Sequence, residues 1–158
     1  MAQTKALPKQ QQTRKLVAGN AELRSAIIDI VSRAERTLSL LTPNLEPEIY
    51  EHDDFLVALK RFVLGKSFAR VRVLITEPER AIKTGNQLVQ MGQRLSSHIE
   101  LRNLAADLRP ERQAFCISDS DSVLYRADYT THEGMVAMQA PEIAKLYLTE
   151  FDEIWQAS

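Results

Sequence analysis

The sequence predicts an α/β domain built on a mixed, mostly parallel sheet with helices on both of its faces. Three observations carry this prediction. Helical segments alternate with short apolar runs up to about residue 104, a group of strands follows, and a helix closes the chain. Strands joined by a helix commonly lie parallel with right-handed crossovers, so the alternating part favours parallel pairing.

Apolar residues recur at helical spacing in four segments, which predicts four amphipathic helices. In the third segment Gly85 and Gly92 share one face, which favours close packing against a neighbouring backbone. Residues typical of helix starts and ends mark several of the boundaries. The predicted helices are 21–36 after Asn20, 53–65 ending near Gly65, 82–95 after Pro78, and 141–155 opened by Pro141.

Short runs rich in β-branched and apolar residues predict the strands. The Asp-Ser-Asp turn at 119–121 joins two of these runs and predicts a hairpin. The acidic stretch 44–54 contains no such run, and we expect it to be an exposed connection. The predicted strands are 37–42, 71–75, 99–104, 114–117, 123–126 and, more weakly patterned, 134–140.

The chain of 158 residues has the size of one domain. Residues 1–18 contain four basic side chains, no acidic ones and a run of three glutamines, so little apolar surface is available to order them. We therefore predict a flexible basic tail over 1–18 and a single domain over 19–158.

Composition narrows the range of partners and compartments. Apolar residues make up 44% of the chain, charged residues 26%, and the net charge is −1. Without a basic surplus, nucleic-acid binding is not favoured. There is one cysteine, no secretory signal and no apolar run of about 18 residues, so we expect a cytoplasmic protein without a membrane span.

Common site motifs are missing from the sequence. The five glycines are too far apart for a phosphate-binding loop, and no serine lies in a G-x-S-x-G turn. The acidic stretch 44–54 lacks the turn glycine of a calcium loop, and His52, His98 and His132 do not have zinc-ligand spacing. We expect no metal and no cofactor, and we interpret Cys116, between Phe115 and Ile117, as a core residue.

The stretch from Arg112 to Arg126, RQAFCISDSDSVLYR, has a recognisable order: a polar edge, a strand, an aspartate, a turn and a second strand. It resembles the second half of a phospholipase D-like domain, where a strand carrying H-x-K-x-x-x-x-D leads into a second strand and a Gly-Ser element. Glu133 with the following strand and closing helix, and AERTLSLLTPNL near the start, are similar to that superfamily as well. The resemblance implies a phospholipase D-like fold over 19–158.

The chain departs from the family motif at its reactive positions. With Asp119 on the motif aspartate, Arg112 takes the place of the histidine and Ala114 that of the lysine, while Arg126 and Ala127 replace Gly-Ser. In the family, the resemblance implies, the histidine attacks phosphorus and the lysine holds the phosphate oxygens. A guanidinium stays protonated and has no lone pair to offer. We therefore expect a pseudoenzyme with no catalytic residue.

Two interpretations of the arginines remain open. Arg112, Asp119, Arg126 and Glu133 would form a binding site for a phosphate-type anion, with the arginines as forked donors. In the alternative, the arginines pair with Asp119, Asp121 or Asp128 in a local salt-bridge network.

The expected function is a non-catalytic binding or assembly module. The resemblance implies a homodimer, because single phospholipase D-like halves commonly pair across the motif-bearing face; a different protein partner is the other option. Two alternatives remain, a residual phosphodiesterase-like hydrolase and a nucleic-acid-binding protein. The hydrolase would use Asp119, Glu133, His132 and Tyr125, and the nucleic-acid binder would use the tail with Lys66, Arg70, Arg72, Arg102 and Arg109.

Overall fold

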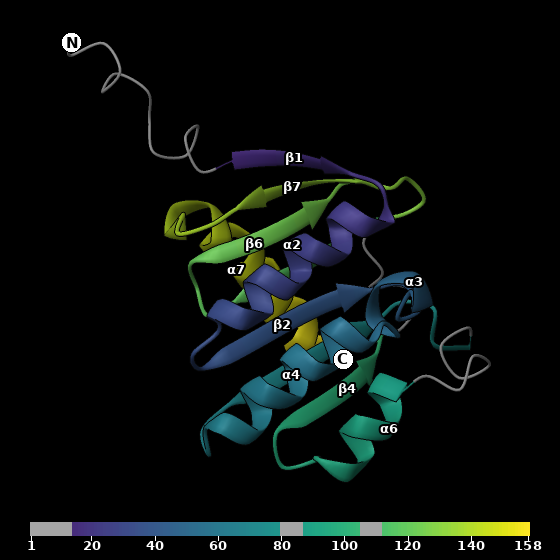
Figure 1. Cartoon of the computed structure of the whole chain (residues 1–158), viewed down its shortest axis with the longest axis vertical. Helices are drawn as coiled ribbons and strands as arrows, with labels where there is room; N and C mark the ends of the chain where they lie inside the picture. Colours follow the sequence, from purple (N-terminus) through teal and green to yellow (C-terminus); the bar gives the residue numbers. More distant parts are fainter. Residues whose placement is uncertain (1–13, 80–86, 105–111) are drawn as a thin grey trace.

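The computed structural model describes residues 14–79, 87–104 and 112–158, which form one seven-stranded sheet with helices on both faces (Figure 1). The strand order is β1-β7-β6-β5-β2-β3-β4. The strands are β1 (Arg14–Ala18), β2 (Thr37–Thr42), β3 (Arg70–Ile75), β4 (Ile99–Asn103), β5 (Ala114–Ser118), β6 (Ser122–Arg126) and β7 (Glu133–Ala137). The helices are α2 (Asn20–Arg33), α3 (Pro47–Tyr50), α4 (Asp53–Gly65), α6 (Gln87–Arg94) and α7 (Pro141–Ala157).

The expectation of a mostly parallel sheet is wrong. Only β2–β3 and β3–β4 pair in parallel, whereas β2–β5, β5–β6, β6–β7 and β1–β7 are antiparallel. The reason lies in the connections. Helices separate β2, β3 and β4 along the chain, but β5, β6 and β7 follow one another through short turns, which only antiparallel neighbours allow. The hairpin predicted at 119–121 is confirmed.

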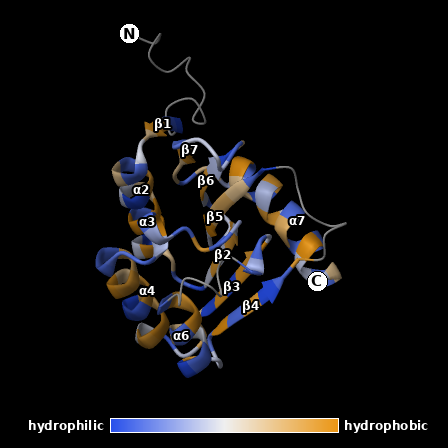
Figure 2. Ribbon diagram, turned by 90° about the vertical axis from the view of Figure 1, so that its right-hand side faces the viewer, coloured by the Kyte–Doolittle hydropathy of each residue, from blue (hydrophilic) through white to orange (hydrophobic). Residues whose placement is uncertain are grey.

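The helices divide unequally between the two faces of the sheet (Figure 2). On one face lie α2, α3, α4 and α6, and their core includes Ile27, Leu40 and Leu59. On the other face α7 is the one described helix that covers the sheet, and its core includes Phe115 and Phe151. Because α7 contacts β2, β5 and β6, this second core is centred on the middle strands, away from β1.

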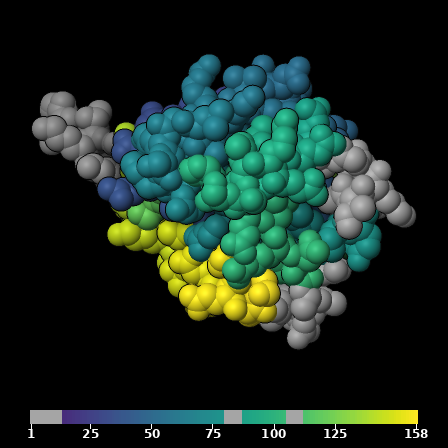
Figure 3. Space-filling model, turned by 90° about the horizontal axis from the view of Figure 1, so that it is seen from below, coloured from purple at the N-terminus to yellow at the C-terminus, as the bar shows by residue number. Residues whose placement is uncertain are grey.

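The C-terminal turns of α7 lie against the segment that contains α6 and β4, as the space-filling view from below shows (Figure 3). Arg102 of β4 stacks on the Trp155 ring at 4.0 Å and donates a hydrogen bond to the Trp155 carbonyl at 2.7 Å. Arg72 stacks on the neighbouring Phe151 ring at 4.8 Å and pairs with Asp152 at 2.9 Å. These contacts fix the helix end against β3 and β4. No helix in the described ranges is long and apolar enough to cross a membrane.

The predicted flexible tail extends too far, because residues 14–18 are the edge strand β1. This strand pairs with β7 in register from Arg14↔Ala137 to Ala18↔Glu133. Val17 is buried against α2, while Leu16 on the opposite face is 83% exposed. The basic composition of residues 1–18 suggested a flexible tail, and the strand was missed because its partner β7 lies far along the chain. Residues 1–13 lie outside the described part.

The stretch 44–54 is not simply an exposed connection. It contains the single-turn helix α3, and the side chains of Leu45, Ile49 and Tyr50 are buried. Tyr50 packs edge-on against Phe55 at the start of α4. The acidic residues of this stretch therefore lie on a segment that is packed against the core beside the end of β2.

Several predicted boundaries also move. The first helix ends at Arg33 instead of 36, because the following backbone is held by Asp119 as described below. The last strand is Glu133–Ala137, shifted from the expected 134–140. Gly92 approaches side chains rather than backbone, since an added Cβ would lie 2.5 Å from the Leu101 side chain. Gly85 and Arg109 lie outside the described residues.

Cys116 provides a test of the core. Burial raises the pKa of its thiol to about 12, against about 8.5 for a free thiol. At pH 8 the thiolate fraction should be on the order of a thousandfold lower in the folded chain than in the unfolded one. We expect a chromogenic disulfide reagent to react slowly with native protein and quickly in denaturant, with Cys116→Ala as the blank. Equal rates in both conditions would contradict the buried position.

Candidate functional site

The four residues expected to form the site do not come together. Arg112 precedes β5 and Asp119 follows it, so the two stand at opposite ends of the sheet. At about 3.3 Å per residue the strand separates them by roughly 20 Å. Arg126 and Glu133 lie at the same end as Arg112, which we call the motif end, but on opposite faces of the sheet.

Asp119 has a structural role in the β5–β6 turn. Its carboxylate accepts backbone N–H bonds from Glu35 at 3.1 Å, Arg36 at 2.8 Å and Thr37 at 3.1 Å. Its own N–H donates to the Thr37 carbonyl at 2.8 Å. Asp119 has a φ of 54°, a value that aspartate tolerates in turns. One carboxylate thus fixes both the hairpin turn and the start of β2.

Arg126 is the central residue of the motif end. Its side chain is only 2% exposed. It lies on the α2 face of the sheet, the same face as Leu124 two residues earlier in β6, which belongs to the core on that side. One terminal nitrogen of the guanidinium donates to Glu46 at 2.7 Å, and the other terminal nitrogen donates to the carbonyls of Tyr129 and Thr131, each at 2.9 Å. The buried Nε has no hydrogen-bond partner among the described residues. The charge is therefore compensated within the chain, and the donors used in these bonds point at protein oxygens.

Arg112 is placed quite differently. Its side chain is 68% exposed, and its nearest described acid is Asp128, at 3.6 Å. Its backbone has a φ of 52°, and its carbonyl accepts the N–H of Tyr129 at 2.8 Å. Hydrogen bonds from Thr130, with a smaller contribution from Arg112, lower the pKa of Asp128. Arg112 is the one of the two arginines whose charge faces solvent.

Two tyrosines extend this network. The Tyr129 hydroxyl donates to Glu77, after β3, at 2.7 Å, and this hydrogen bond raises the pKa of Tyr129. Tyr50 is buried beside Glu46 and Cys116, and desolvation raises its pKa well above the usual value. Both hydroxyls therefore stay protonated at neutral pH. Sequence reasoning missed Tyr50, Tyr129 and Glu77, because no motif links residues this far apart.

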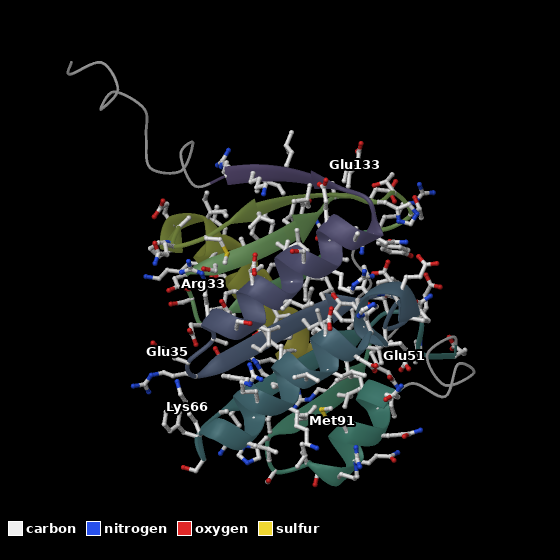
Figure 4. The ribbon with its side chains drawn as sticks, viewed as in Figure 1. Arg33, Glu35, Glu51, Lys66, Met91 and Glu133 are labelled. Atoms are coloured by element: carbon white, nitrogen blue, oxygen red, sulfur yellow. The ribbon has the colours of Figure 1, made fainter. Side chains whose placement is uncertain are left out.

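Glu133 points away from this network. Within β7 it shares a face with Met135, on the α7 side, whereas Arg126 packs against Gly134 on the α2 side. Figure 4 shows Glu133 near the end of β7 beside β1. It lines a largely apolar hollow of about 510 Å³ together with Leu16, Met135 and Tyr147. The sequence placed Glu133 with the arginines, but the structure assigns it to another surface.

Acidic side chains outnumber the two arginines among the described residues named here at the motif end. Glu46 pairs with Arg126, Asp128 pairs with Arg112, and Glu77 accepts the Tyr129 hydroxyl. Glu51 of the neighbouring stretch also lies here (Figure 4). Within the described ranges, no group of three or more histidine, cysteine or carboxylate residues is arranged to hold a metal ion. The arrangement holds protein segments together and provides little excess positive charge for an incoming anion.

The two arginines should differ sharply in their contribution to stability. Arg126→Ala leaves the partly buried Glu46 carboxylate and two carbonyls without their donor, a change that typically costs about 3–5 kcal/mol. Arg112→Ala removes an exposed pair typically worth less than about 1 kcal/mol. Urea unfolding of both variants measures the difference.

If Arg126→Ala does not fold, Glu46→Gln tests the same interaction with a smaller change of shape. This variant should also be less stable than Arg112→Ala. Equal losses for substitutions at the two arginines would contradict the central place given to Arg126.

Comparison with solved structures identifies the fold. The archaeal chromatin protein TrmBL2, whose structure is described as showing a novel mode of DNA binding, aligns with a TM-score of 0.65 at 17% identity, over 99% of this chain and 57% of its own. Nuc from Salmonella typhimurium, a phospholipase D family member, aligns with a TM-score of 0.60 at 18% identity, over 90% and 95% of the two chains.

Phosphatidylserine synthase from Haemophilus influenzae Rd KW20 aligns with a TM-score of 0.61 at 14% identity, over 91% of this chain and 36% of its own. This chain thus spans little more than half of TrmBL2 and about a third of the synthase. At these identities the likeness shows the fold alone, which is phospholipase D-like.

The search of curated protein sequences finds no match. A family model, described as a domain of unknown function (DUF7931), matches residues 19–158. Since that match includes nearly all of the sheet and every described helix, the chain belongs to the DUF7931 family.

Proposed function

We propose that this chain is a non-catalytic module that uses a phospholipase D-like fold for binding or assembly. The observation that carries the proposal is the state of Arg126. In the alignment to the family motif this arginine replaces the glycine of the Gly-Ser element, and here it is buried and bound to Glu46 and two carbonyls. The arginine side chain occupies the position where the family has a glycine, and Glu46 compensates its charge.

The chemistry of the motif end agrees with this proposal. Arg112 stands where the family has its attacking histidine, and a guanidinium has no lone pair for attack on phosphorus. The nearby Tyr129 hydroxyl donates to Glu77 and has a raised pKa, so it is a poor nucleophile at neutral pH. Ala114 provides no positive charge for phosphate oxygens in a transition state.

The contacts of the arginines favour the salt-bridge network over the forked anion site. Arg126 has its charge compensated by Glu46, and Arg112 lies beside Asp128. Asp119 is at the far end of β5, and Glu133 is on the other face of the sheet. A phosphate-type anion would therefore meet one exposed arginine with an acid beside it.

An activity assay tests the proposal directly. We expect no hydrolysis of bis-nitrophenyl phosphate or of single-stranded DNA above the buffer blank, with or without a chelator, because the arginine and alanine at the histidine and lysine positions of the motif can neither attack phosphorus nor hold its oxygens. An active phospholipase D family nuclease serves as the positive control. Metal-independent turnover that is lost in Asp119→Ala or His132→Ala would overturn the proposal.

Calorimetric titration tests the anion site separately. We expect inorganic phosphate to bind no more tightly than in the millimolar range, and Arg112→Ala to change this little, because a lone exposed charge pair contributes less than about 1 kcal/mol. Micromolar binding that is lost in Arg112→Ala would instead restore the anion site.

One surface favours nucleic-acid binding as a second candidate function. At the sheet end opposite the motif end, a basic end is formed by Arg33, Arg36, Arg61, Lys66 and Arg70. Arg33 and Lys66 line one hollow of about 520 Å³, which Glu35, Asp119 and Asp121 also line. Arg36 stacks at 5.6 Å on Phe68, a residue that is 53% exposed. Arginines beside an exposed aromatic ring suit a single strand with stacking bases. The likeness to the DNA-binding TrmBL2 adds support.

This second candidate makes its own prediction. Fluorescence anisotropy with a labelled single-stranded oligonucleotide should show salt-dependent binding, and the single variants Arg33→Glu and Lys66→Glu should each weaken it and flatten its dependence on salt. Lys145→Glu, on exposed α7, is the control with the same change of charge. Equal weakening by the control, or no binding at low salt, would rule out the basic end as the interface.

A further inference from the structure

We propose that two copies of this chain pair through the outer edge of β1, in a two-fold dimer where Arg14 of each copy meets the partner's Glu133. The inference rests on the proposed function and deepens it, because it names the assembly partner as a second copy. The surface is a sheet edge, distinct from the motif-bearing face where the resemblance places family dimers.

The first observation is the open edge. β1 is the terminal strand of the sheet, and in the described part of the chain it pairs with β7 alone. An edge strand presents unpaired N–H and C=O groups that another chain can extend. Neither proline nor a bulge interrupts β1, whose sequence is RKLVA.

The direction of the backbone groups can be read from two hydrogen bonds. The Gly19 N–H donates to the His132 carbonyl at 2.6 Å, toward β7. Bonding pairs alternate along an antiparallel ladder, so Val17 and Lys15 also face β7 while Leu16 and Arg14 direct their N–H and C=O groups outward. The outward Ala18 N–H bonds to its own Glu22 carboxylate at 2.9 Å, which agrees with this assignment.

A two-fold axis at Leu16 lets the outward N–H and C=O groups of β1 pair with those of a second copy. In the antiparallel pair Leu16 faces the partner's Leu16, and the two residues exchange two hydrogen bonds. The Arg14 N–H then faces the partner's Ala18 carbonyl, once on each side of the axis. The Glu22 carboxylate, which now accepts the outward Ala18 N–H at 2.9 Å, has to swing away so that the partner's Arg14 carbonyl can take its place.

Exposed apolar surface surrounds the same strand. Leu16 is 83% exposed and Leu146, across the hollow of about 510 Å³ on the α7 face, is 70% exposed. The same hollow is lined by Tyr125, Met135 and Tyr147. Apolar groups beside an open edge favour association. A second Leu16 at the axis would remove both leucines at position 16 from water.

Charge complementarity selects a second copy as the occupant. Arg14 and Glu133 are both exposed on the α7 face, and neither forms an ion pair with another described residue. Within one copy they stand at opposite ends of β1, roughly 13 Å apart at about 3.3 Å per residue. In the dimer Arg14 lies beside the partner's Ala18, whose methyl group is too small to keep it from the partner's Glu133 on the next strand.

Sedimentation of the purified full chain tests the dimer. We expect a reversible monomer–dimer equilibrium with a dissociation constant between about 1 µM and about 1 mM, the range suited to a small interface. A chain that stays monomeric at about 1 mM overturns the inference. So do larger oligomers, because a two-fold interface closes at two copies.

Charge exchange tests the arrangement itself. Arg14→Glu and Glu133→Arg should each weaken the dimer about tenfold or more, since each places like charges together. An equimolar mixture of the two single variants should form a heterodimer, because both charge pairs across that interface then have opposite signs. The double variant should also regain its homodimer. No recovery in either case would overturn the pairing of Arg14 with Glu133.

Substitutions at Leu16 test the strand edge. Leu16→Pro removes an outward N–H but no bond to β7, a change that edge strands tolerate, and it should abolish the dimer while the thermal unfolding midpoint changes little. Leu16→Arg should do the same, whereas Leu64→Arg, on the exposed side of α4, is the matched control. Dimers that persist in both Leu16 variants contradict the proposal.

The same samples separate this inference from the proposed function. Diester hydrolysis by the wild-type chain contradicts a non-catalytic module whatever the oligomeric state. A monomeric chain without hydrolysis contradicts the dimer alone and leaves the module without its named partner.

Discussion

The buried ion pair of Arg126 with Glu46 is the interaction on which the motif end depends. It joins the end of β6 to the segment after β2, two places that lie 80 residues apart in the chain. The same guanidinium fixes the loop before β7 through the carbonyls of Tyr129 and Thr131. A buried charge needs a partner and hydrogen bonds, and in the described part of the chain only Nε of this guanidinium has none. Three segments are therefore held in one arrangement that leaves little of this guanidinium for a ligand.

The opposite end of the sheet depends on Asp119 in a comparable way. Its carboxylate gathers the N–H groups of residues 35–37, so the exit from α2, the start of β2 and the β5–β6 turn share one anchor. In the alignment to the phospholipase D motif expected from the sequence, Asp119 is the one residue that matches. Its retention here has a sufficient structural reason, which means that an aspartate at this position is weak support for catalysis.

Local patterns predicted the local structure well. The strand 37–42 and the turn at 119–121 were confirmed, because alternation, apolar runs and turn residues act over a few positions. Long-range features were missed for the same reason. The pairing of β1 with β7, the antiparallel contact of β2 with β5 and the contact of Arg126 with Glu46 depend on residues far apart in sequence. The four residues of the candidate site do not meet. Arg126 lies beside Gly134, so the neighbouring Glu133 points to the opposite face of the sheet, and the length of β5 separates Arg112 from Asp119.

The two ends and the edge of the sheet differ in what they leave unsatisfied. At the motif end both arginines are paired with acids of the chain, so an anion there would have to compete with existing salt bridges. The buried atoms Asn44 Oδ1, Thr76 Oγ1, Gln113 Oε1 and Arg126 Nε have no hydrogen-bond partner among the described residues. At the β1 edge, main-chain donors and acceptors, an exposed leucine, and an arginine and a glutamate without ion-pair partners in the described residues lie together. Association is favourable where it satisfies groups that folding left open. We therefore expect this domain to bind its partner along the side of its outermost strand and not at the strand ends, where the resemblance places the chemistry of phospholipase D-like enzymes.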